Sequence, residues 1–111
     1  ETMKIRLKDA SVRVGGLVPE LSLGLLIVAS HWPEDFDIFV TSANDAHHSH
    51  TPPPYAGAAL DLRSRHLPAD GMKLELRDEV NQALGPDFDF LLEDLGGPNE
   101  HFHLEYQPKR R

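Results

Sequence analysis

Short stretches of this chain alternate hydrophobic and polar residues, or concentrate β-branched and aromatic ones, as strands with one buried face do. In such a strand, residues two apart point to the same side, so one set enters the core and the other stays outside. This pattern predicts five strands, at 3–7 (MKIRL), 37–42 (DIFVTS), 58–64 (AALDLRS), 87–94 (DFDFLLED) and 101–106 (HFHLEY).

Two other stretches carry apolar residues at helical spacing. The first spans 19–31 and begins at Pro19, whose missing N–H costs nothing in a first turn. It is apolar enough to predict a largely buried helix, in which Gly24 either weakens the helix or lets another element approach closely. The second, 72–85, is amphipathic, and Gly85 is a typical C-terminal stop.

The elements follow one another in the order β-α-β-loop-β-α-β-β. We expect the segment between the strands at 37–42 and 58–64 to be a loop, because Pro52–Pro54 favour extended backbone without N–H donors. The last two strands resemble a hairpin. The sequence therefore predicts an α+β fold, in which two helices pack on a mainly antiparallel sheet.

Length and composition restrict the functional class. The 111 residues suffice for a single domain over 1–111. A net charge of −7 argues against nucleic-acid binding, which needs clustered Lys and Arg. The chain has no cysteine, so thiolate zinc ligands are excluded. The longest apolar run, 23–29, is too short for a membrane span, and nothing near the N-terminus resembles a signal peptide.

Histidine is the unusual component of this composition. His47, His48 and His50 fall within four residues, and His101 and His103 share one face of the last predicted strand. Histidines near carboxylates favour a metal site or a pH-sensitive one. The first three also fit an ordinary polar surface loop, and His101 fits a solvent-facing residue beside a site better than a ligand.

Three segments together, TSANDAHHS, YAGAALDLR and EHFHLEY, carry a family resemblance. The chain resembles the zinc-dependent D,D- and L,D-peptidases of the D-alanyl-D-alanine carboxypeptidase group, in their short bacterial and phage forms. Their pattern is S-x-H-x-x-G-x-A-x-D, followed later by E-x-x-H. Gly57, Ala59 and Asp61 match the first part, and Glu100 and His103 match the second. The resemblance implies the fold shared by these peptidases and the Hedgehog signalling domain.

The resemblance also implies a Zn²⁺ ion held by His, Asp and His. Asp61 and His103 would be ligands, and Glu100 would be the catalytic base that takes a proton from the zinc-bound water. The position of the first histidine ligand holds Pro54, and that of the preceding serine holds Pro52. His50, or alternatively His48, is the candidate replacement ligand.

The implied function is a zinc peptidase that acts on peptidoglycan stem peptides, as a D-Ala-D-Ala carboxypeptidase or an endolysin. It would be made in the cytoplasm of a bacterium or a phage-infected cell and act on the cell wall. Arg63 and His101 are candidate substrate-binding residues, although Arg63 also fits a plain strand ion pair. The alternative is a catalytically degenerate member of the fold that serves as a binding or structural module, because proline has no ligand atom.

Overall fold

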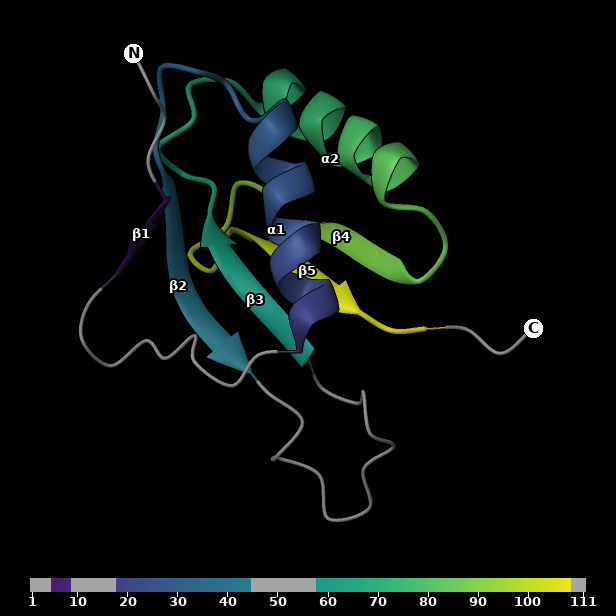
Figure 1. Ribbon diagram of the computed structural model, residues 1–111. Coiled ribbons are helices and arrows are strands. Elements are labelled where there is room, and N and C mark those ends of the chain that lie inside the picture. Colours follow the sequence, from purple (N-terminus) through teal and green to yellow (C-terminus); the bar gives the residue numbers. More distant parts are fainter. Residues whose placement is uncertain (1–4, 9–17, 45–57, 109–111) are drawn as a thin grey trace.

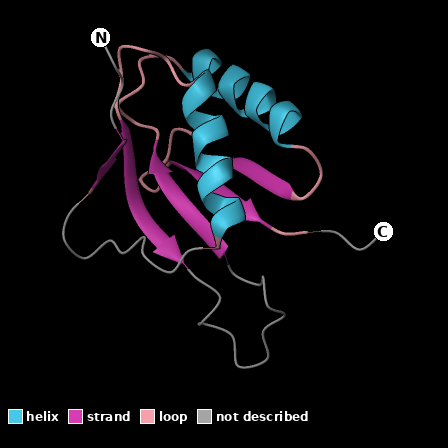
Figure 2. Ribbon diagram, viewed as in Figure 1, coloured by secondary structure: helices cyan, strands magenta, loops and turns pink. Residues whose placement is uncertain are grey.

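The computed structural model describes residues 5–8, 18–44 and 58–108, which form an α+β fold. Five strands make one mixed, mostly antiparallel sheet in the order β1-β2-β3-β5-β4, with β1 and β2 as the parallel pair. Both helices cover the same face of this sheet (Figures 1 and 2). The elements are β1 (Ile5–Leu7), α1 (Pro19–His31), β2 (Ile38–Asn44), β3 (Ala58–Arg63), α2 (Asp70–Leu84), β4 (Phe88–Glu93) and β5 (His101–Tyr106).

The predicted element order and the final hairpin of β4 and β5 are confirmed. Among the described residues, two boundaries differ from the sequence prediction by two residues, and the others by one at most. Helix α2 begins at Asp70, earlier than expected, because the acidic residue suits the first turn. Strand β2 continues to Asn44, because its last residues pair with β3. The predicted loop beyond Asn44 lies outside the described residues, as do His47, His48, His50 and Pro52–Pro54.

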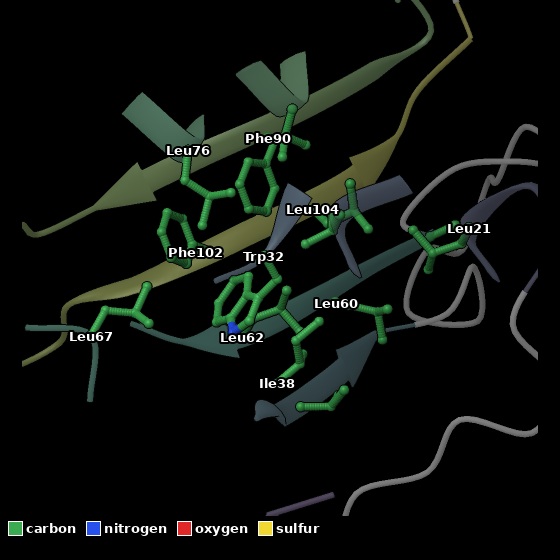
Figure 3. Packing of buried hydrophobic residues seen from close by; sticks show 14 residues of the cluster. Leu21, Trp32, Ile38, Leu60, Leu62, Leu67, Leu76, Phe90, Phe102 and Leu104 are labelled. Atoms are coloured by element: carbon green, nitrogen blue, oxygen red, sulfur yellow. The ribbon is translucent and has the colours of Figure 1, made fainter. Parts of the chain in front are cut away.

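The core lies between the sheet and the two helices (Figure 3). Phe90 of β4 and Phe102 of β5 stack with ring centroids 4.9 Å apart. Trp32, at the end of α1, meets the edge of Phe102 at 5.7 Å. The largest fully buried side chains are Phe90, Phe102, Leu21, Ile38, Leu60, Leu62, Leu104, Val28, Val40 and Val80.

Helix α1 is less buried than its composition suggests. Only one side of it contacts the sheet, and Leu23 and Leu26 are each 60% exposed, so the prediction of a largely buried helix was wrong. Gly24 marks the contact side, because a Cβ atom there would lie 2.8 Å from Cε1 of Phe88. The glycine thus permits the close approach of helix and strand. Among the described residues, neither helix is long and apolar enough to cross a membrane.

At the centre of the sheet, alternation along the strands places apolar side chains on one face and polar side chains on the other. Leu60 and Leu62 of β3 point into the core, as do Phe102 and Leu104 of β5. The residues between them therefore face the side of the sheet opposite α1 and α2 (Figure 1). This open face holds Asp61 and Arg63 of β3 beside His101 and His103 of β5.

Candidate metal centre

Asp61, His101 and His103 form a compact group on the open face. Asp61 and His103 are direct cross-strand partners, and His101 lies two residues from His103 on the same side. One ligand atom from each residue can be chosen so that all three lie within 4.8 Å of one another. Asp61 Oδ1 is 2.7 Å from His103 Nδ1 and 3.8 Å from His101 Nε2. Three potential ligands therefore converge on one point.

The remaining polar atom of each ligand is held by a partner outside the group. Asp61 Oδ2 accepts a hydrogen bond from Ser42 Oγ at 2.8 Å. His101 Nδ1 donates to the Asn99 carbonyl at 2.5 Å, and His103 Nε2 donates to Glu105 Oε1 at 3.0 Å. Outer hydrogen bonds of this kind orient histidine and carboxylate ligands in metal sites. The remaining atoms are Asp61 Oδ1, His103 Nδ1 and His101 Nε2, the last of which also lies 2.9 Å from Glu93 Oε1.

The charges within the group are strongly coupled. The hydrogen bond to Asp61 raises the pKa of His103 to about 9 against the opposing effect of burial, with further support from Glu105. Burial alone would raise the pKa of Asp61, but hydrogen bonds from His103 and Ser42 outweigh it and lower that pKa. In the metal-free protein at neutral pH, a proton therefore lies between His103 Nδ1 and Asp61 Oδ1, the two atoms that would bind a cation.

This raised pKa predicts how the stability of the metal-free protein depends on pH. The pKa of His103 is higher in the folded than in the unfolded chain, so its contribution is complete below about pH 6.5 and disappears as pH rises through about 9. The difference in unfolding free energy between wild type and His103→Gln should be largest below pH 6.5. Urea unfolding of chelator-treated protein measures this difference, and a constant value from pH 6 to 9.5 would contradict the assignment.

The donor set fits a borderline divalent cation. Two imidazole nitrogens and one carboxylate oxygen are the ligands of catalytic zinc sites, which keep a further position open for water or substrate. The same set also accommodates iron(II) and other first-row ions. Asp61 and His103 are thus brought together as the sequence predicted, whereas His101, expected beside the site, lies within the ligand group itself.

Glu100, the predicted catalytic base, is bonded to residues outside the ligand group. Its Oε2 accepts hydrogen bonds from Lys73 Nζ of α2, at 2.8 Å, and from Ser64 Oγ, and its Oε1 accepts one from the Gly96 N–H at 3.0 Å. Burial would raise its pKa, but the bonds from Lys73 and Ser64 prevail and lower it to about 2. Glu100 is 8% exposed and is not part of the Asp61–His101–His103 group.

A different carboxylate, Glu93 of β4, lies beside the ligand group. It is the direct cross-strand partner of His101, and its Oε1 is 2.9 Å from His101 Nε2. Its side chain is 46% exposed and therefore accessible to solvent. Glu93 was not among the predicted site residues, although alternation with the inward-facing Phe88 and Phe90 places it on the outer face of the predicted hairpin.

Arg63 also lies on the open face, opposite His101. Its guanidinium Cζ stands 4.4 Å from the centroid of the Phe39 ring. Within the part of the chain that the structure describes, Arg63 forms no ion pair with a carboxylate, so the alternative of a plain strand ion pair is not seen. The guanidinium is therefore positioned by stacking.

Comparison of this chain with models of protein families, with curated proteins and with solved structures found no match.

Proposed function

We propose that this domain binds Zn²⁺, or a similar divalent ion, through Asp61 Oδ1, His101 Nε2 and His103 Nδ1, and hydrolyses a peptide bond there. The observation that carries the proposal is the convergence of these three atoms, each on a residue whose other polar atom is already held. A bound ion would supply Lewis-acid chemistry and lower the pKa of water.

Glu93 is the residue proposed to accept the proton from the attacking water. Its carboxylate adjoins His101 and is exposed, and it becomes available once His101 Nε2 binds an ion instead. Glu100 is a poor base by comparison, because a carboxylate with a pKa of about 2 holds a proton only weakly, and because it is already paired with Lys73. The base is therefore assigned to Glu93 in place of the glutamate of the E-x-x-H motif.

The resemblance to cell-wall peptidases supports the choice of bond. It rests on residues that include Asp61 and His103, two members of the ligand group, and it suggests stem peptides of peptidoglycan as substrates. We extend the proposal to that substrate class and to the peptidase fold on this support.

A metal-binding domain without catalytic activity is the second candidate. It is favoured by the position of Glu100, since the motif carboxylate forms a buried ion pair with Lys73 instead of facing the ligands. According to this second candidate, the Asp61–His101–His103 group binds an ion that helps to bind a partner but catalyses no reaction. Hydrolysis of stem peptides by the zinc-loaded protein would exclude it.

Calorimetric titration of the chelator-treated protein with Zn²⁺ tests the shared part of both candidates. We expect one tight site, lost in Asp61→Ala and His103→Ala and weakened in His101→Ala. His31→Ala is the matched control, because this histidine lies on α1, outside the ligand group, where its Nδ1 is 4.0 Å from Glu79.

The affinity for Zn²⁺ should also depend on pH. Because a proton must leave His103, affinity should rise about tenfold per pH unit from pH 6 to 8. Absence of zinc binding by the wild type would refute the proposal.

A further inference from the structure

A hollow of about 570 Å³ opens beside the ligand group, a size that suits a small ligand or the end of a peptide. Asp61 and His101 form part of its wall, so the hollow adjoins the candidate metal centre. The wall also contains the hydroxyl residue Thr41, three cationic residues, Lys8, Arg63 and Arg65, and Glu100, whose charge is paired with Lys73.

The charge of this hollow differs from that of the whole chain. The protein has a net charge of −7, yet three of its cationic residues converge here. Within residues 5–8, 18–44 and 58–108, no carboxylate forms an ion pair with Lys8, Arg63 or Arg65. Their positive charge is therefore available to an anionic ligand.

Arg63 is the best placed of the three. Stacking on Phe39 orients its guanidinium, and its register position opposite His101 brings it next to a candidate ligand residue. Arg65 Nη1 makes only a long contact, 3.4 Å, with the Pro98 carbonyl. A planar guanidinium offers two parallel N–H groups to a carboxylate, which makes arginine suited to this recognition.

We propose that this hollow binds a carboxylate of the substrate, with Arg63 as the main contact and Arg65 and Lys8 in support. The inference rests on the proposed function, because the neighbouring Asp61–His101–His103 group would then act on a bond close to that carboxylate. A single negative charge fits better than a phosphate dianion, because Asp61 and Glu100 line the same hollow and Glu93 adjoins His101. The carboxylate is either a peptide C-terminus or an acidic side chain.

Two-dimensional NMR titrations of the metal-free full chain test this directly. The probes are N-acetylglycine, which carries a terminal carboxylate, N-acetylisoglutamine, which carries a side-chain carboxylate, the neutral N-acetylglycinamide, and inorganic phosphate. We expect at least one carboxylate probe to bind about tenfold more tightly than the amide, with shifts around the hollow. Arg63→Gln and Arg65→Gln should each weaken that binding, whereas the matched control Arg77→Gln, an exposed arginine of α2, should not.

The outcomes separate this inference from the proposed function. If Zn²⁺ binds but neither carboxylate probe does, with or without zinc, the carboxylate pocket is refuted and the metal centre stands. If a probe binds through Arg63 but zinc does not, the pocket is supported and the proposed function fails. Tighter binding of phosphate, or an equal loss in Arg77→Gln, would refute the assignment to a carboxylate.

Discussion

Lys73→Met should reduce the free energy of unfolding by about 3–5 kcal/mol, because it leaves the Glu100 carboxylate buried without its cation. The side chains of Lys73 and Glu100 are only 7% and 5% exposed, and their charged atoms are 2.8 Å apart. Glu100 also accepts hydrogen bonds from Ser64 and Gly96, so one carboxylate joins α2, the end of β3 and the β4–β5 turn. Urea unfolding at pH 7 measures the loss.

Two further variants make this prediction specific. Asp70→Ala removes only an exposed partner of Lys73, 3.4 Å away, and should cost less than about 1 kcal/mol. The double variant Lys73→Met with Glu100→Leu should recover much of the loss, because no buried charge remains. A Lys73→Met protein as stable as wild type would show that the ion pair contributes nothing to folding.

Under the proposed function, Glu93→Gln should lower peptide hydrolysis by a factor of about 10² to 10⁴ while leaving zinc affinity nearly unchanged. The reason is that Glu93 contacts His101 from outside the ligand group and supplies the exposed carboxylate there. The measurement is turnover of stem peptides by the zinc-loaded protein, together with calorimetric zinc titration of the same variant.

Glu100→Gln is the matched comparison for Glu93→Gln. It should affect stability through Lys73 and Ser64, with turnover per folded molecule largely retained. The reverse result, in which Glu100→Gln abolishes turnover of folded protein and Glu93→Gln does not, would return the role of base to the motif glutamate. Loss of zinc binding in Glu93→Gln would make Glu93 a ligand instead.

Alternation was the most informative property of the sequence. It predicted that His101 and His103 share a face while Phe102 and Leu104 enter the core, and the structure confirms both. The burial of α1 was harder to predict, because the apolar composition of a helix does not say how much of it the sheet will cover. The short strand β3 was predicted correctly because Leu60 and Leu62 alternate with polar residues, so that only one face of the strand can be buried.

The site shows why a linear motif can mislead. In extended chain, residues three apart point to opposite sides, so an E-x-x-H spacing leading into a strand separates its glutamate from its histidine. Glu100 accordingly turns to Lys73 and His103 turns to Asp61. The ion pair of Lys73 and Glu100 joins residues 27 positions apart, and such a contact follows from packing that local patterns do not encode.

Strands β3 and β5 are already joined along their backbones by a continuous ladder from Ala58 to Arg63. Under the proposed function, an ion displaces a proton from His103 and replaces Glu93 at His101, but the backbone that carries these side chains need not rearrange. Little backbone entropy is therefore lost on loading. Stripping the ion away should therefore leave an idle but intact molecule, ready to be reloaded.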